Sequence, residues 1–198
     1  EAANLGVQVF GGHGYIKEHG MEQIVRDARI STLYEGTTGI QALDLLGRKV
    51  LMGSKGKCVR DFPLEMVRFA RPHLLRRTPL GAMARNLAAR AAEWNLLTTA
   101  IMLRAPKDRE VVGAASVDYL MYSGFVMMGY YWAGQAAKAE ELLASGQGKE
   151  SEDFYRSKVQ TAEFYFERLM PRANAHRTGA LAPTRSVMQL DNEHFAFA

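Results

Sequence analysis

The sequence has few residues that would support a disulfide framework or a metal centre. Cys58 is the only cysteine among 198 residues, which excludes an intrachain disulfide and fits a reducing compartment, so we expect a cytoplasmic protein. Histidines are equally sparse, and their dispersal along the chain indicates structural or surface roles and no metal site. They are His13, His19, His73, His176 and His194.

An excess of charge of one sign is also lacking. The chain has 25 basic and 21 acidic residues, a net charge of +4, and its basic residues are scattered without interleaved aromatic side chains. This pattern argues against nucleic-acid binding, whereas an anionic small-molecule partner fits it. Hydrophobic residues make up 47% and charged residues 23%, which is typical of a globular chain.

Only one long uncharged run occurs. Residues 119–137 lack charge over 19 positions, close to the length that a bilayer requires. The run contains four Tyr and three Gly together with Ser123 and Gln135, and Asp118 and Lys138 flank it. This composition is too polar for a good membrane span, so we expect the central helix of a bundle and no integral membrane segment.

The beginning of the chain carries no initiator methionine and no signal peptide. Its first residues, EAANLGVQVF, have a helical pattern without a capping residue before them. We therefore expect a fragment or a domain of a longer protein, with further residues upstream.

The remaining pattern is helical throughout. Apolar residues recur with a period near 3.6, and no alternating run with hairpin signals occurs, so we predict an all-α chain. The first helix should end near Phe10, and a glycine-rich loop follows it. A second helix should run from about Met21 to Tyr34. A third should begin with a capping box of Thr38 and Gln41. Its predicted apolar stripe is Ile40, Leu43, Gly47 and Val50.

A change in pattern follows the third helix. Small, polar and basic residues at 54–61 indicate a linker between residues 1–53 and 62–198. Longer helices come next, with short connections, which predicts an antiparallel bundle followed by a tail. One helix should end before Pro72, and the next should start with Thr78 as N-cap. We expect two buried faces: Leu87, Ala91, Trp94, Thr98 and Ile101, and later Tyr155, Val159, Ala162, Phe166 and Leu169.

Glu35 is the residue that points most directly to chemistry. If the second helix reaches Tyr34, Glu35 falls on its apolar face, seven residues after Ala28 and eleven after Ile24. It also lies at the helix C-terminus, where the dipole disfavours negative charge. Poor hydration and the dipole would both favour the protonated carboxyl group, so Glu35 is a candidate general base.

The residues after Glu35 add to this hypothesis. Gly36 allows a ligand to approach the backbone closely. The N–H groups near Thr37, Thr38 and Gly39 lie at the start of a helix, a favourable place for an anion or an electron-rich ring edge. A base beside such donors suits proton abstraction next to a carbonyl group.

A family resemblance becomes specific over about 45 residues. The order and spacing resemble the signature region of the acyl-CoA dehydrogenase family, an FAD-dependent family of lipid metabolism and fatty-acid β-oxidation. The matching pieces are Gln8, Gly11-Gly12, Gly14-Tyr15, Arg26-Asp27-Ala28, Tyr34-Glu35-Gly36-Thr37 and Ile40-Gln41.

The resemblance implies a function and roles for these residues. Glu35 would remove the α-proton of an acyl-CoA thioester while the β-hydrogen leaves as hydride to FAD, giving a trans-2-enoyl-CoA. Tyr34 and Gly36 would line the acyl-thioester pocket. Cofactor contacts would come from Thr37 and Gly39, and from Gln8, Gly11 and Gly12, which typically hold the adenosine-diphosphate end of FAD from the neighbouring subunit. The active form would then be at least a homodimer, with electron-transfer flavoprotein as the usual electron acceptor.

Other interpretations of the same residues remain open. Arg26 and Asp27 suit a structural ion pair, and Tyr15 suits a core position. Gly39 departs from the family pattern, since many members have a polar residue there. Some members also carry the base elsewhere on the fold.

The region after residue 61 resembles the extra helical domain of a bacterial subgroup. That subgroup includes long-chain-type and 3-methylmercaptopropionyl-CoA dehydrogenases, and the closing stretch SVMQLDNEHFAF is similar to its ending. The Met and aromatic residues at 127–132 are expected to be core residues. The fold class implied is the end of the catalytic helical domain followed by a helical bundle, and we expect the fragment alone to be inactive. Two alternatives stay open: a dehydrogenase for sulfur-containing short acyl-CoAs, and a non-catalytic helical dimerisation module.

Overall fold

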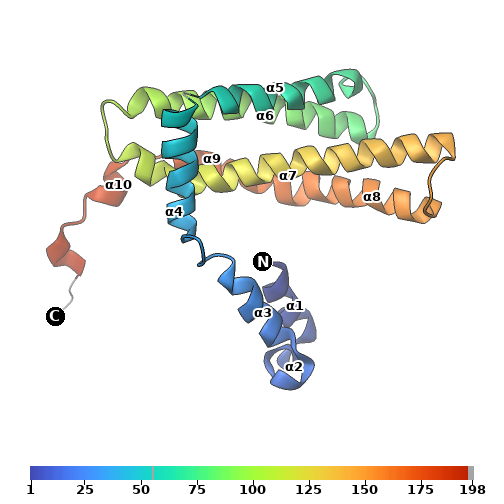
Figure 1. Ribbon diagram of the computed structural model, residues 1–198, viewed down its shortest axis with the longest axis horizontal. Helices are drawn as coiled ribbons and strands as arrows, with labels where there is room; N and C mark the ends of the chain where they lie inside the picture. Colours follow the sequence, from blue (N-terminus) through green and yellow to red (C-terminus); the bar gives the residue numbers. More distant parts are fainter. Residues whose placement is uncertain (55, 196–198) are drawn as a thin grey trace. The chain divides into compact units, whose positions relative to one another are not determined.

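The computed structural model describes residues 1–54 and 56–195 (Figure 1). Within these residues every regular element is helical and no strand occurs, which confirms the predicted all-α class. Lys55 of the expected linker and Ala196 and Phe197 of the closing stretch lie outside the described residues. The chain divides into two compact units, Glu1–Gln41 and Ala42–Ala198.

The first unit consists of short helices around the glycine-rich loop. They are α1 (Ala2–Phe10), α2 (Gly12–Tyr15), the 3₁₀ turn η1 (Lys17–His19) and α3 (Met21–Ile30). The predicted end of the first helix at Phe10 is confirmed, and both α2 and α3 pack against α1.

This first unit buries almost nothing of its own. Gly14 is its only fully buried residue, while large apolar side chains lie exposed on its surface. Among them are Leu5, Val9, Phe10, Ile24, Ile30, Leu33, Tyr34 and Ile40. A unit of this size without an apolar core gains little stability from burial, and exposed apolar side chains in such numbers suit contact with another surface.

The third helix differs from its prediction in the face it buries. It begins as α4 (Thr38–Leu43) and continues as the π-helical η2 (Asp44–Gly53). The buried side chains are Ala42, Leu46 and Val50, so of the predicted stripe only Val50 is confirmed as buried, and Ile40 and Leu43 are exposed. The spacing of four residues suits the wider turn of a π-helix, which rotates later positions away from a 3.6-residue stripe.

The second unit begins before the predicted linker and contains the predicted helical bundle (Figure 1). Helix α5 packs on α6, α6 on α7, and α7 on both α8 and α9. Their bounds are Lys57–Ala70 for α5, Pro79–Arg104 for α6, Val111–Ser145 for α7, Glu152–Phe164 for α8 and Ala173–Leu181 for α9. Short turns η3 (Arg71–His73), η4 (Tyr165–Leu169) and η5 (Met170–Arg172) join some of them, and α10 (Arg185–Met188) and η6 (Asn192–Phe195) form the tail.

Capping residues set the helix ends, although one helix begins earlier than predicted. The Thr78 hydroxyl accepts a hydrogen bond from the Gly81 N–H at 3.3 Å, which confirms it as the N-cap of α6. Gly146, with φ 64°, ends α7 as a left-handed glycine cap. Helix α5 begins at Lys57, earlier than predicted and inside the expected linker, because Gly56 with φ 79° reverses the chain just before it.

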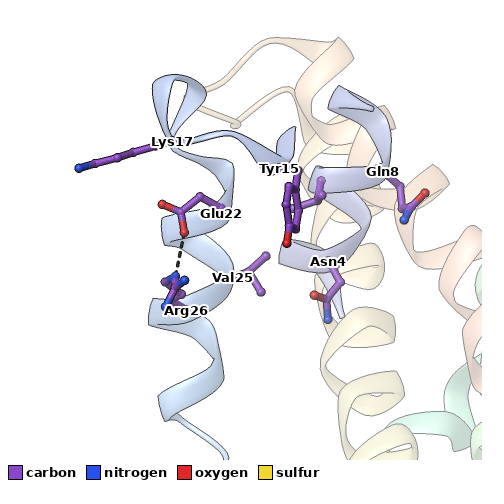
Figure 2. Close-up of a pocket in the computed structure, with 8 residues that line it drawn as sticks. Asn4, Gln8, Tyr15, Lys17, Glu22, Val25 and Arg26 are labelled. Carbon is purple, nitrogen blue, oxygen red and sulfur yellow. Dashed lines mark hydrogen bonds and ion pairs between the residues drawn. The ribbon is translucent and has the colours of Figure 1, made fainter. Parts of the chain in front are cut away.

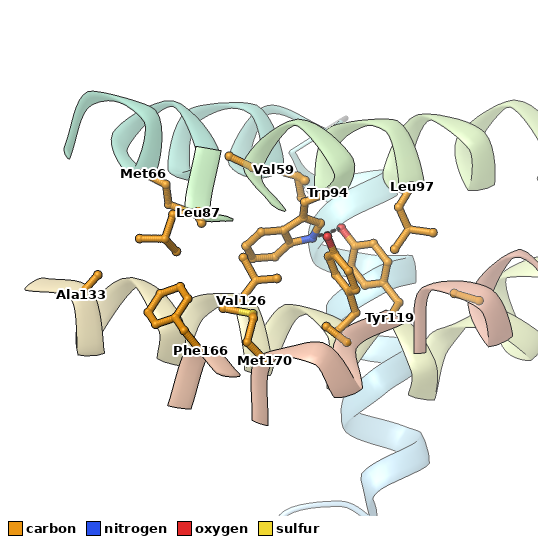
Figure 3. Packing of buried hydrophobic residues seen from close by; sticks show 14 of the residues in the cluster. Val59, Met66, Leu87, Trp94, Leu97, Tyr119, Val126, Ala133, Phe166 and Met170 are labelled. Atoms are coloured by element: carbon orange, nitrogen blue, oxygen red, sulfur yellow. Dashed lines mark hydrogen bonds between the residues drawn. The ribbon is translucent and has the colours of Figure 1, made fainter. Parts of the chain in front are cut away.

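The core of the bundle contains the predicted α6 face. All five residues of that face are buried, and so are Tyr155, Ala162 and Phe166 of the later stripe, whereas Val159 and Leu169 are half-buried. Figure 3 shows the α6 side chains Leu87, Trp94 and Leu97 packed between α5 and α7. The 3.6-residue period therefore predicted which faces of these helices are buried.

A polar cluster lies within this core. The indole N–H of Trp94 donates to the Tyr119 hydroxyl at 3.1 Å, and the Thr98 hydroxyl lies 2.7 Å from the same oxygen (Figure 3). The Thr98 hydroxyl also donates to the Trp94 carbonyl at 2.9 Å. Because each buried polar group has a partner, the cluster specifies how α6 and α7 pack without leaving an unpaired group.

Helix α7 departs from prediction on one face. Met127, Met128 and Tyr131 are 40%, 50% and 54% exposed, so the expectation that they are core residues was wrong. The helix is apolar on every side, and the bundle covers the face carrying Tyr119, Tyr122 and Val126 instead. By length and composition α7 is the one candidate membrane span in the described part of the chain. Its packing against α6, α8 and α9 is that of a core helix.

Buried tyrosines should make the bundle sensitive to alkali. Burial raises the pKa of Tyr119 and of Tyr165 to about 12, from an ordinary value of 10.0. Since the folded state disfavours the phenolate, these residues contribute stability that is complete below pH 10 and is lost as the pH rises toward about 12. We expect the free energy of unfolding, measured by urea denaturation, to fall across this window. The free energy of unfolding should fall less steeply with pH in Tyr119→Phe than in the wild type. Tyr131→Phe, which changes an exposed ring, is the control. Equal slopes in the two variants would contradict the prediction.

Candidate active site

The predicted site residues lie in the first unit and at the start of α4, on two separate turns. Gln8 is in the last turn of α1, and Gly11 and Gly12 follow that helix directly. Residues 34–37 form the connection between α3 and α4, and Gly39 lies in the first turn of α4.

Glu35 is not part of a helix, contrary to the sequence interpretation. Helix α3 ends at Ile30, four residues earlier than predicted. The hydroxyls of Ser31 and Thr32 donate to the carbonyls of Ala28 and Arg29, which otherwise would continue the helical ladder. Side chains of this kind compete with helix formation through such local bonds, so the chain turns here. The argument from the helix face and the helix dipole therefore does not apply to Glu35.

The turn at Glu35 has an unusual backbone. Glu35 has φ 58° and is the only non-glycine residue with positive φ in the described residues. Gly36 follows with φ 112°, a conformation that requires glycine. A non-glycine residue in the left-handed region costs about 1 kcal/mol or more and tends to occur at functional sites.

The carboxylate of Glu35 is exposed, as are Tyr34 and Thr37 beside it. The expectation of a poorly hydrated carboxylate is therefore not met by this chain on its own. The Glu35 N–H donates to no group in the described part of the chain, which leaves it available to an oxygen outside the chain. The turn thus presents an acid–base group and a free donor on one residue.

Gln41 holds this turn, a contact that the sequence interpretation missed. Its side-chain amide donates to the Glu35 carbonyl oxygen at 2.5 Å. The predicted capping box with Thr38 is wrong, because Thr38 is already the first residue of α4, and the Gln41 N–H donates to the Thr37 carbonyl at 3.0 Å. Only the Ile40-Gln41 piece of the family pattern could have indicated the contact.

The glycines of the candidate cofactor site differ in whether the fold itself requires glycine at that position. A Cβ on Gly14 would lie 2.7 Å from the Val7 carbonyl oxygen, so α2 can pack on α1 only with glycine there. Gly11 has φ 59°, which also favours glycine. Gly12 and Gly39 have neither property: their φ is ordinary and nothing lies within 4 Å of an added Cβ. Nothing in the described chain explains glycine at these two positions, whereas a ligand close to the backbone would.

A groove of about 750 Å³ lies between α1 and α3 (Figure 2). Tyr15 projects into it and is 81% exposed, so the expectation of a core position was wrong. Gln8 lines the same groove. The other lining residues are Asn4, Val7, Lys17, Glu22, Val25 and Arg26.

Arg26 and Asp27 do not pair with each other, although both make side-chain contacts. Arg26 pairs with Glu22 at 2.8 Å, and Asp27 accepts from the Gln23 amide at 2.8 Å. Each partner lies four residues earlier on α3, where helix geometry brings side chains together. The predicted ion pair between Arg26 and Asp27 is therefore wrong, and each side chain contacts a neighbour on α3 instead.

Metal-ligating side chains do not gather in groups of three or more within the described residues. His13 and His19 lie close to each other, with ring centroids 5.1 Å apart, and His176 pairs with Asp118 at 2.8 Å in the bundle.

Glycine substitutions test the distinction drawn within the loop. Gly14→Ala should disturb α2, because backbone atoms of Val7 would have to move, at a cost of about 1–3 kcal/mol. Gly12→Ala should leave the loop unchanged, since its Cβ would meet open space. Amide hydrogen exchange over residues 7–16 would show faster exchange only in Gly14→Ala. Equal exchange in both variants would contradict this account.

Two family profiles match the chain. "Acyl-CoA dehydrogenase, C-terminal domain" matches residues 1–51, and "Acetyl-CoA dehydrogenase C-terminal like" matches residues 64–191. The first match contains the turn at Glu35 and the glycine loop, and the second covers most of the bundle.

Similar proteins are found among curated bacterial enzymes. The chain is 38% identical over 182 residues to 3-methylmercaptopropionyl-CoA dehydrogenase from Ruegeria pomeroyi, covering 90% of this chain and 30% of that protein. It is 29% identical over 194 residues to a broad-specificity linear acyl-CoA dehydrogenase from Mycobacterium tuberculosis, covering 96% and 32%. A butyryl-CoA dehydrogenase from Syntrophomonas wolfei subsp. wolfei is 29% identical over 170 residues, covering 83% and 27%. The chain spans about a third of the length of these relatives.

Proposed function

Because this chain belongs to the acyl-CoA dehydrogenase family, we propose that it supplies the catalytic base of an FAD-dependent enzyme that oxidises an acyl-CoA to a trans-2-enoyl-CoA. One observation carries the proposal. The family's Tyr-Glu-Gly-Thr sequence coincides with the one non-glycine positive φ among the described residues, directly before a helix N-terminus. Backbone strain of this kind is typical of functional residues.

Glu35 would act as the base toward the α-carbon of the thioester. An α-proton is very weakly acidic, so the carboxylate must be close, and the thioester carbonyl must be polarised as negative charge develops on its oxygen. The unused N–H of Glu35 is a suitable donor to that oxygen. The α-proton passes to the Glu35 carboxylate. In the complete enzyme, meaning this chain together with the further segments that its relatives have, those segments would exclude water from this carboxylate.

FAD, when bound, would supply the oxidising power by accepting the β-hydride. The residues present fit such a cofactor, since Gly12 and Gly39 leave their backbone open to a close ligand. Gln8, Gly11 and Gly12 would hold its adenosine-diphosphate end. Thr37 and Gly39 would contact it beside the helix N-terminus, where free N–H groups favour electron-rich atoms.

The partners follow from the same proposal. Tyr34 and Gly36 would line the pocket of the acyl-CoA thioester. If Gln8 and its loop serve the neighbouring subunit, as the family resemblance implies, the enzyme is at least a homodimer. Electron-transfer flavoprotein would be the electron acceptor, and the cytoplasm the compartment.

A second substrate class is favoured by one observation. The 38% identity to 3-methylmercaptopropionyl-CoA dehydrogenase extends over 90% of the chain and so includes the bundle as well as the signature region. A sulfur-containing short acyl-CoA is therefore the alternative to a linear fatty acyl-CoA. Both substrates would use the same base and the same oxidation.

Replacing the base gives the direct test of the proposed chemistry. Glu35→Gln in the complete enzyme should retain bound FAD, because the amide is nearly isosteric with the carboxylate. Its turnover should fall by at least about 10³-fold, because the amide cannot accept the α-proton. Turnover and flavin content would be measured on the same preparation. Turnover like that of the wild type would exclude Glu35 as the base, and a colourless wild-type protein with an intact fold would favour a non-catalytic helical module.

Substrate class can be determined by flavin bleaching. Linear acyl-CoAs from C3 to C16 and a methylthio analogue of propionyl-CoA would each be added to the complete enzyme under anaerobic conditions. We expect bleaching with one class at low concentration, because the acyl pocket discriminates among chains by apolar contact. Selective bleaching by the methylthio compound would establish the alternative, and bleaching by none would argue against both.

A further inference from the structure

The Gln41 side chain reaches back over the turn that carries the candidate base. Its amide N–H donates to the carbonyl oxygen of Glu35. We propose that Gln41 is a positioning residue for Glu35. The hydrogen bond from Gln41 locks the left-handed turn and so sets the direction of the Glu35 carboxylate. This inference rests on the proposed function of Glu35 as the base.

The turn needs such a lock because its backbone is unfavourable. Glu35 has φ 58°, a conformation that a non-glycine residue keeps only when surrounding contacts enforce it, whereas glycine adopts the φ of 112° at Gly36 without strain. On the preceding side, the Tyr34 N–H donates to the Ile30 carbonyl at 3.1 Å. On the following side, the Gln41 amide provides the hydrogen bond that joins the turn to α4. Removing this hydrogen bond would leave the C-terminal half of the turn without that connection to α4.

The shape of the site also fits this role. The Gln41 backbone is itself anchored, because its N–H donates to the Thr37 carbonyl in the first turn of α4. A Cβ on Gly36 would lie 3.1 Å from the Gln41 amide nitrogen and 3.2 Å from the Ile40 side chain. Glycine at position 36 therefore serves two purposes, since it adopts the positive φ and leaves room for the amide.

The expected consequence is catalytic and does not involve cofactor binding. A carboxylate displaced by about 1 Å from a carbon acid can lose about 100-fold in rate, because the base no longer lies in line with the proton. The Gln41 amide itself contacts only the backbone of Glu35 among its side-chain hydrogen bonds in the described residues, so it would act through that residue.

The first experiment uses the complete enzyme with Gln41→Leu, which removes the donor at similar size. We expect kcat to fall by about 10- to 100-fold with the KM for acyl-CoA and the Kd for FAD within about twofold of the wild type. Deuterium at the α-carbon should slow the variant more than the wild type, because proton abstraction becomes more rate-limiting. Gln41→Lys, which restores an N–H donor on a long stem, should recover most of the lost kcat.

Gln23→Leu provides the matched control, since Gln23 is an exposed glutamine whose amide bonds to Asp27 on α3, away from the turn. Its kcat should stay within about twofold of the wild type. An unchanged kcat in Gln41→Leu would overturn the proposal. So would a fall in kcat matched by an equal loss of FAD affinity without recovery in Gln41→Lys, because that would indicate a general structural role.

A second experiment needs no activity measurement. Crystal structures of the complete enzyme as the wild type and as Gln41→Leu would report φ of Glu35 directly. We expect positive φ in the wild type and its loss in Gln41→Leu, with residues 34–37 in another conformation. Retention of the wild-type turn in Gln41→Leu would overturn the lock. Full turnover in Glu35→Gln would instead refute the proposed function, whatever the turn does.

Discussion

The backbone at Glu35 and Gly36 is the constraint on which the candidate site depends. With both residues at positive φ, the chain leaves the direction of α3 and enters α4 within a few residues. A helical Glu35 would project from a helix face among its neighbours, with its N–H used in the helical ladder. The left-handed turn instead presents the carboxylate and the unused N–H together. The proposed chemistry needs this combination, because the α-proton of the thioester must be accepted while a hydrogen bond is donated to its carbonyl oxygen.

The two units of the chain obtain their order in different ways. The bundle has a contiguous core that contains a hydrogen-bonded cluster of Trp94, Thr98 and Tyr119. The first unit has many exposed apolar side chains and one buried glycine. The signature residues therefore lie in a part of the chain that has no apolar core of its own. A local device such as the Gln41 amide matters more in such a unit, because packing does not enforce the turn.

Glycine positions separate structural from ligand-facing requirements in this chain. Gly14 is required by a neighbouring backbone atom, and Gly36 by its φ. Gly12 and Gly39 are required by nothing in the described chain, although glycine is unfavourable in a helix and Gly39 lies in one. The sequence alone does not reveal this difference. Only the folded structure shows which of them leave space for a group that approaches from outside.

The sequence alone determined the helical class, the buried face of α6, the start of α6, and the order of the signature residues. These depend on local periodicity and capping, which act within a few residues of one another. It did not determine the buried face of the third helix, the exposed side of α7 around Met128, or the turn at Glu35. The first two were decided by tertiary structure, and the third by local hydrogen bonds that the helical pattern does not reveal. A uniformly apolar helix carries no sequence signal for the side that its neighbours will cover. The hydrogen bond from the Gln41 amide to the carbonyl of Glu35, six residues earlier, forms only once the chain has turned.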